Sequence, residues 1–190
     1  MDEPDQPADE PDRSSSAAPA RPAIALDLLD PKRLLEAHEL RWLREHAELA
    51  LREVARRSGR SGELRVRVVD DAEMAAAHER YSGVPGAPDV LTFDLAQDQD
   101  QDQGRALDAD ALVCADAAAR QARARAHPRA RALLLYVLHG ALHAIGHDDT
   151  DDAGYARMHA LEDEILESIG VGATFNVSPA GGSDSNGGPR

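Results

Sequence analysis

The residues of this chain that are best suited to chemistry lie at positions 133–149, with the sequence LLLYVLHGALHAIGHDD. His139 and His143 are four residues apart, so on an α-helix their imidazoles lie on one face and can reach the same point. Gly146 follows and is suited to ending the helix in a left-handed turn. That turn can bring a side chain of the segment His147–Asp149 back toward the pair. The spacing therefore predicts a metal site with two helical ligands and a third after a turn.

An open three-ligand site of this kind favours metal-assisted hydrolysis. Imidazole nitrogens with a carboxylate or a third imidazole suit Zn²⁺ best, and other first-row metals that bind imidazole fit the same donors. The fourth position is left for water, whose pKa the metal lowers toward ~7. Zinc peptidases with this histidine spacing place a glutamate general base directly after the first histidine. Gly140 stands there instead, which argues against proteolysis and lets a substrate or a neighbouring strand approach closely.

The helix that carries the histidines is expected to be central and buried. It should open at Pro128 and run to about Ile145, and its residues are apolar nearly all round. A single histidine in such a helix is more often a hydrogen-bonded core residue than a ligand. Two histidines on one face, followed by a glycine turn and a His-Asp-Asp cluster, favour metal binding.

The remaining pattern predicts an α+β (mixed α/β) fold, in which a small sheet of about four strands packs with about five helices. Short apolar or alternating segments predict strands at 23–29, 63–70, 89–94 and 110–114. Apolar residues at helical spacing predict helices at 34–58, 70–81, 115–126, 128–145 and 151–169.

One domain is expected at 23–170, between two tails. Residues 1–22 are acidic and rich in Pro and Ser, and residues 171–190 are rich in Gly and Ser, so both are expected to be disordered. The polar run QDQDQDQ at 97–103 is expected to be a mobile loop. Hydrophobic residues make up 42% of the chain, enough for a sizeable core.

The composition also excludes several classes of protein. The net charge of −14 argues against a broadly basic nucleic-acid-binding surface, though not against a local one. Cys114 is the single cysteine, so neither an intrachain disulfide nor a cysteine-rich zinc knuckle can form. Since no signal peptide and no apolar run of membrane-spanning length is visible, we expect a cytoplasmic protein without a membrane partner.

Several segments together resemble the YbeY family of bacterial endoribonucleases, also called rRNA maturation factors. HGALHAIGHDD resembles the family signature H-G-x-L-H-x-x-G-x-D-H. RVRVVDDAEMAAAHERY, APDVLTF and DALVC resemble the family's strand–helix segment, its P-T-D-V-L-S-F and its G-D-I-V-I-C. The helix with Leu161-Glu162 and Glu164-Ile165 resembles the family's closing acidic helix. The resemblance covers roughly residues 23–170 in order and implies a small α/β fold with the zinc site beside a sheet.

The resemblance implies one Zn²⁺ ion held by His139, His143 and Asp149, with the two histidines as catalytic residues. The family's third histidine falls at Asp149, and aspartate is also a competent zinc ligand. His147, four residues after His143, is the rival third ligand. Asp148 aligns with the family's own aspartate and is expected to have a structural or orienting role.

The expected RNA contacts depart from the family pattern. Ser82 replaces the family's arginine after the tyrosine, and Pro88 replaces its threonine in P-T-D. Arg80 is the nearest guanidinium and, with Arg65, is a candidate substrate-binding residue. Further candidates for phosphate contacts are Arg67, Arg120, Arg123 and Arg125.

The resemblance thus implies a zinc-dependent endoribonuclease, specific for single strands, in late 16S rRNA 3′-end maturation and ribosome quality control. Its expected partners are the 16S rRNA precursor and the small ribosomal subunit. Two alternatives remain open. A metallopeptidase-like hydrolase would use the same metal, but Gly140 disfavours it. A non-catalytic, ribosome-associated factor would keep the zinc without cutting RNA.

Overall fold

The computed structural model describes residues 22–96 and 106–174. The predicted tails, 1–22 and 171–190, lie outside these residues except for position 22 and positions 171–174. The predicted loop at 97–103 also lies outside them. At the C-terminal end of the described chain, the carbonyls of Gly172 and Ala173 accept hydrogen bonds from Arg131, so residues 171–174 still belong to the folded part.

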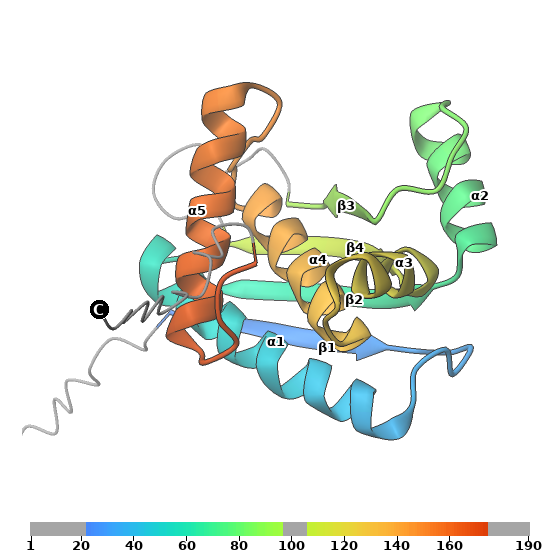
Figure 1. The fold of residues 1–190 in the computed structure, drawn as a ribbon. Helices are drawn as coiled ribbons and strands as arrows, with labels where there is room; N and C mark the ends of the chain where they lie inside the picture. Colours follow the sequence, from blue (N-terminus) through green and yellow to red (C-terminus); the bar gives the residue numbers. More distant parts are fainter. Residues whose placement is uncertain (1–21, 97–105, 175–190) are drawn as a thin grey trace, which may run out of the picture.

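The described residues form an α+β fold, as predicted (Figure 1). The strands are β1 (Ile24–Leu29), β2 (Gly62–Val69), β3 (Val90–Asp94) and β4 (Leu107–Cys114). The helices are α1 (Ala37–Ser58), α2 (Asp71–Ser82), α3 (Ala115–Arg125), α4 (Arg129–Ala144) and α5 (Asp152–Ser168).

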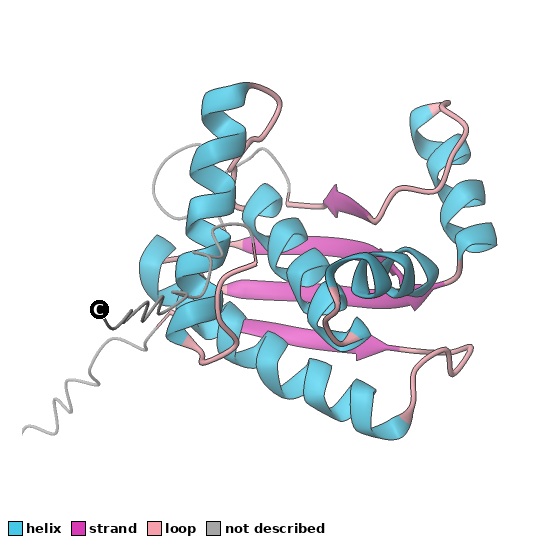
Figure 2. Ribbon diagram, viewed as in Figure 1, coloured by secondary structure: helices cyan, strands magenta, loops and turns pink. Residues whose placement is uncertain are grey.

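The four strands form one sheet with the order β1–β2–β4–β3 (Figure 2). β1, β2 and β4 are parallel, and β3 is antiparallel to β4 at one edge. β4 begins at Leu107, earlier than predicted. Apolar and acidic residues alternate there, and Asp108 and Asp110 each accept a hydrogen bond of 2.5 Å from the guanidinium of Arg65 on β2. These cross-strand ion pairs explain why the strand extends through a polar sequence.

Helices α1 and α4 pack against each other and against the sheet, and α5 contacts both of them (Figure 1). α4 is the central buried helix that the sequence predicts, because Leu133, Leu134 and Leu138 are fully buried. Pro128 is its N-cap rather than a residue of its first turn. Within the described ranges, no helix is long and apolar enough to cross a membrane.

An ion pair joins the first turns of α1 and α4. The Glu39 carboxylate accepts hydrogen bonds from both Nε and Nη2 of Arg129, and the Nε–Oε1 distance is 3.1 Å. Both side chains are largely buried, with exposed fractions of 16% and 27%. The Arg129 guanidinium holds the pKa of Glu39 below its usual value. The pair thus ties the start of the histidine-bearing helix to α1.

Replacing Glu39 with glutamine is expected to make the free energy of unfolding less dependent on pH in the acid range. Because the folded-state pKa of Glu39 lies below the ordinary value of 4.5, the pair stabilises the fold above pH 4.5. This stabilisation is lost as the pH falls through the lower, folded-state pKa. Urea unfolding should therefore show a wild-type advantage of about 1–2 kcal/mol near neutral pH that disappears in acid.

The matched control for this measurement is Glu48→Gln. Glu48 lies on the same helix in an exposed pair with Arg52, at 3.7 Å. Its removal should change neither the stability nor the pH profile measurably, because exposed pairs contribute little. If the free energies of unfolding of the wild type and Glu39→Gln changed in parallel with pH, the Glu39–Arg129 pair would not be a source of pH-dependent stability.

Candidate metal centre

Helix α4 ends in a glycine turn, as the sequence predicts. Gly146 has a φ of +98°, a conformation that favours glycine. Its N–H donates to the carbonyl of His143 at 2.9 Å, and the N–H of His147 donates to the carbonyl of Leu142 at 3.0 Å. These two bonds define a Schellman motif, which satisfies the last carbonyls of the helix and sets the direction of the following segment.

The side chains of His139, His143 and Asp149 meet beside the end of α4. The Nε2 atoms of the two histidines are 3.0 Å apart. Asp149 Oδ2 lies 3.7 Å from Nε2 of His139, and Asp149 Oδ1 lies 3.4 Å from Nε2 of His143. One ligand atom from each residue lies within 4.8 Å of the others. The structure therefore brings together the three residues to which the family resemblance points.

The other ring nitrogen of each histidine is held by a hydrogen-bond acceptor. Nδ1 of His139 lies 2.8 Å from Oε1 of Glu162, and Nδ1 of His143 lies 3.0 Å from the carbonyl oxygen of His147. A carboxylate and a carbonyl only accept hydrogen bonds, so Nδ1 carries the hydrogen in each neutral ring. Both Nε2 atoms are then left with a free lone pair that faces the cluster, as in metal-binding histidines.

This donor set fits a metal cation. Two nitrogen lone pairs and a carboxylate face one point, and negative potential of this kind is relieved by a cation between the groups. Imidazole nitrogen and carboxylate oxygen are ordinary ligands of Zn²⁺ and related first-row metals. The three residues could therefore hold one metal ion, at a place where their side chains remain 19–32% exposed to solvent.

The residue that orients His139 was not identified from the sequence. Glu162 lies on α5 and is fully buried, and its second oxygen, Oε2, is 2.6 Å from Nδ1 of His159. One buried carboxylate thus bridges two imidazoles. A signal was present in the helical spacing, which places this charged residue on the same face as the apolar Met158 and Ile165. A charge on the buried face of an amphipathic helix requires a partner.

The loop between α4 and α5 is shaped by Asp148 and packs closely on α5. Asp148 Oδ1 accepts from the N–H of Thr150 at 3.1 Å, and Oδ2 accepts from its hydroxyl at 2.7 Å. Asp148 therefore builds a local turn. Gly154, in the first turn of α5, lies so close to the carbonyl of Asp148 that an added Cβ would overlap with it. This close approach helps to position Asp149.

The ring of His147, the rival third ligand, is not part of the three-residue cluster. Its backbone carbonyl is the group that accepts the hydrogen bond from Nδ1 of His143. His147 thus contributes to the arrangement through its main chain, and Asp149 supplies the third side chain.

Gly140, between the two histidines, lies against the edge strand of the sheet. A Cβ at this position would be 2.7 Å from Oγ1 of Thr92 on β3, and 3.6 Å from Cγ2 of Val90. The glycine therefore allows a neighbouring strand to approach the helix closely, one of the two explanations that the sequence offers. A side chain on residue 140 would have to displace Thr92.

Gly140→Ala is expected to destabilise the protein by about 1–2 kcal/mol. The new methyl group is overpacked against Thr92, at a typical cost of about 1–3 kcal/mol, and the better helix propensity of alanine offsets up to about 1 kcal/mol of it. The double variant with Thr92→Ala removes the clashing hydroxyl and should recover most of the loss. A double-mutant cycle in urea measures this coupling, and strictly additive effects would rule out the contact as the cause.

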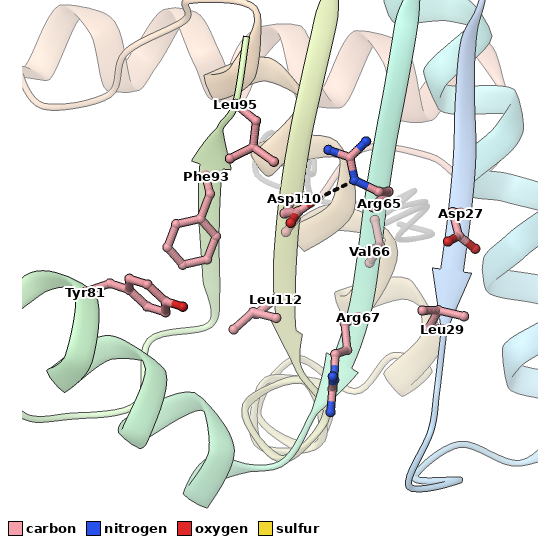
Figure 3. A pocket seen from close by; sticks show the side chains of 11 residues that line it. Asp27, Leu29, Arg65, Val66, Arg67, Tyr81, Phe93, Leu95, Asp110 and Leu112 are labelled. Carbon is pink, nitrogen blue, oxygen red and sulfur yellow. Dashed lines mark hydrogen bonds and ion pairs between the residues drawn. The ribbon is translucent and has the colours of Figure 1, made fainter. Parts of the chain in front are cut away.

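The predicted substrate-binding arginines lie apart from the metal cluster. Arg65 projects with Phe93 and Asp110 into a pocket on the sheet face that points away from Gly140 and α4 (Figure 3). The Arg80 guanidinium lies 5.5 Å from the ring centroid of Tyr81, which also lines that pocket. Whether these arginines contact RNA remains a prediction.

Two of the other candidate arginines form ion pairs with acidic side chains. Arg67 lies 2.9 Å from Glu73, and Arg120 lies 2.5 Å from Asp71. Their charges are therefore partly neutralised within the fold.

The fold and the cluster define a small α+β protein with a candidate metal site of the hydrolytic type. The family profile described as Endoribonuclease YbeY matches residues 31–170. Endoribonuclease YbeY of Halorhodospira halophila is 36% identical over 128 residues, which cover 67% of this chain and 83% of that protein. Endoribonuclease YbeY of Micrococcus luteus is 34% identical over 110 residues, covering 56% of this chain and 70% of that protein.

A solution structure of a protein from Thermotoga maritima is also similar, with a TM-score of 0.49 and 20% identity over 82% of this chain and 99% of its own. From the family profile and the curated relatives, the chain belongs to the YbeY endoribonuclease family. The resemblance inferred from the sequence is confirmed.

Proposed function

We propose that this protein is a zinc-dependent endoribonuclease that cleaves single-stranded RNA. We extend the proposal to late maturation of the 16S rRNA 3′ end and to ribosome quality control in the cytoplasm, with the small ribosomal subunit as partner. The observation that carries it is the cluster of His139, His143 and Asp149 inside the segment that matches the endoribonuclease family.

The side chains of the cluster have separate roles in this proposal. His139, His143 and Asp149 would hold one Zn²⁺ ion, which when bound supplies a Lewis acid for a phosphate oxygen and a water with a pKa of about 7. The Glu162 carboxylate keeps Nε2 of His139 directed at the cluster by accepting the Nδ1 hydrogen. The carbonyl of His147 does the same for His143. The residual exposure of the three ligands leaves the cluster accessible to a phosphodiester.

The experiment that tests this function is a cleavage assay that combines metal removal with metal analysis. The full chain is incubated with a labelled single-stranded RNA, then with chelator, then with Zn²⁺ added back, and the same RNA as a duplex is the specificity control. We expect cleavage of the single strand that chelation abolishes and zinc restores. His143→Ala should lower the rate by on the order of a hundredfold or more, since it removes a ligand.

Other outcomes of the same assay identify the alternatives. Chelator-sensitive cleavage of casein without cleavage of RNA would favour a metallopeptidase-like hydrolase, which is disfavoured because Gly140 stands where the glutamate general base would be. Binding of zinc and of ribosomes without any RNA cleavage would favour a non-catalytic factor. Either result would overturn the proposed ribonuclease activity.

A further inference from the structure

An exposed aromatic ring lies beside the proposed metal centre. Tyr155, in the first turn of α5, is 51% exposed and lines a cavity of about 220 Å³ together with the proposed ligand His139. Other exposed apolar side chains, such as Leu29 and Leu95, line the pocket on the opposite face of the sheet. Single exposed apolar residues are ordinary on a protein surface. The feature that calls for an explanation is therefore the position of Tyr155 next to a metal ligand.

Two ring contacts connect Tyr155 to His139. The Tyr155 ring meets the His159 ring at a centroid distance of 4.0 Å and an interplanar angle of 83°. The His159 ring is stacked toward the His139 ring at 6.4 Å, and the Glu162 carboxylate lies within hydrogen-bond distance of both imidazoles. The rings of Tyr155 and His139 therefore cannot be farther apart than these two centroid distances added together. A neighbouring nucleotide of an extended strand can span such a separation.

The main chain also holds Tyr155 beside the segment that carries the third ligand. The N–H of Tyr155 donates to the carbonyl of Asp151 at 2.8 Å. The preceding Gly154 packs so closely on the carbonyl of Asp148 that an added Cβ would overlap with it, and Asp148 is the direct neighbour of Asp149. Both the ring and the main chain of Tyr155 are thus anchored to the surroundings of the metal cluster.

A ring held in this way is suited to stacking on a nucleobase. The T-shaped contact with His159 covers one face of the Tyr155 ring at most, and it limits the motion that binding would have to freeze. Stacking on aromatic side chains is a main source of affinity for single-stranded nucleic acids and requires no particular base. In a duplex, neighbouring base pairs cover both faces of each base, so only an unpaired base can use the ring.

Resting on the ribonuclease function proposed above, we propose that Tyr155 stacks on an unpaired base of the RNA next to the scissile phosphate. The contact favours single strands without reading their sequence. A neutral ring also supplies affinity that does not depend on basic side chains, in a chain whose net charge is −14. Tyr155 is then a substrate-binding residue, separate from the three proposed ligands.

The test uses a single-stranded RNA of fixed sequence and a series in which one nucleotide at a time, around the cleavage site, lacks its base. With the zinc-loaded full chain, kcat/KM should fall by roughly tenfold at the position whose base stacks on Tyr155. Tyr155→Leu should lower kcat/KM for the intact RNA by a similar factor and should no longer respond to the missing base at that position. Tyr155→Phe keeps the aromatic face and should behave as the wild type.

The matched control is Tyr81→Leu, since Tyr81 is 62% exposed and lines the pocket on the other face of the sheet. It should keep the wild-type response to each missing base. Tyr155→Leu should also keep the wild-type zinc content, and loss of zinc in it would assign Tyr155 a structural role instead. A response to the missing base that is unchanged in Tyr155→Leu, or absent at every position, would overturn the stacking contact while leaving the ribonuclease function in place.

A binding measurement separates this contact from the proposed activity. A uridine strand that carries one 2-aminopurine, a base whose fluorescence is quenched by stacking, is mixed with the zinc-loaded full chain by stopped flow, before cleavage proceeds. The fluorescent base is moved along the strand one position at a time. Quenching by the wild type and by Tyr155→Phe that is lost in Tyr155→Leu supports the contact even if no RNA is cut. Equal quenching by the three proteins, or none at any position, overturns it.

Discussion

Asp149→Ala is expected to abolish stoichiometric zinc binding, whereas His147→Ala is expected to keep it. The carboxylate of Asp149 lies 3.4 Å from Nε2 of His143 and completes the group of three. Its loss leaves two ligands, and the metal affinity should fall by more than the roughly 10–100-fold that follows loss of an outer partner. His147 contributes its backbone carbonyl, which any residue at that position retains.

Zinc content after exhaustive dialysis, determined by mass spectrometry on the intact full-length protein, measures this difference. Asp149→His provides the conservative variant, because imidazole is also a zinc ligand and stands at this position in the family signature. It should recover stoichiometric zinc. Full zinc in Asp149→Ala together with loss of zinc in His147→Ala would show that the third ligand is His147.

Removing the Glu162 carboxylate is expected to weaken both metal binding and the fold. Glu162 is fully buried and accepts hydrogen bonds from His139 at 2.8 Å and from His159 at 2.6 Å. In Glu162→Ala, the two Nδ1–H donors lose their partner, at a cost of about 1–3 kcal/mol each. Because the His139 ring is no longer held in place, zinc affinity should fall by about 10–100-fold.

Two readouts separate these effects. Competition with a chromophoric chelator gives the zinc affinity, and urea unfolding in excess chelator gives the stability without metal. Glu164→Gln is the matched control on the same helix, since Glu164 is 63% exposed and pairs with Arg57 at the surface. It should change neither quantity appreciably. A Glu162→Ala protein that keeps wild-type zinc affinity would show that Glu162 does not orient His139.

The elements of the fold were largely predictable because their patterns are local. The apolar run of α4 and the alternating residues of β2 appear at the predicted places. The early start of β4 at Leu107 was not predictable from the segment alone, because the aspartates in it are stabilised by Arg65 on a different strand. The antiparallel direction of β3 likewise depends on pairing between distant segments.

The residues of the candidate site also differ in whether a local sequence pattern can reveal them. His139 and His143 could be found from their spacing, because one helix places both imidazoles on one face. The choice of Asp149 over His147 depended on the family signature, since the Schellman turn decides which side chain returns to the helix. The contact of Glu162 with His139 joins two helices, so no local pattern contains it.

The separation of Glu162 from the three ligands has a consequence for the recognition of such sites in genomes. His139, His143 and Asp149 all lie within one short motif, whereas the carboxylate that directs His139 lies on the next helix. A protein can therefore carry the complete motif by chance or by descent and still lack the carboxylate that orients its first histidine. A search that also requires an acidic residue on the apolar face of the following helix would select the proteins that keep this second contact.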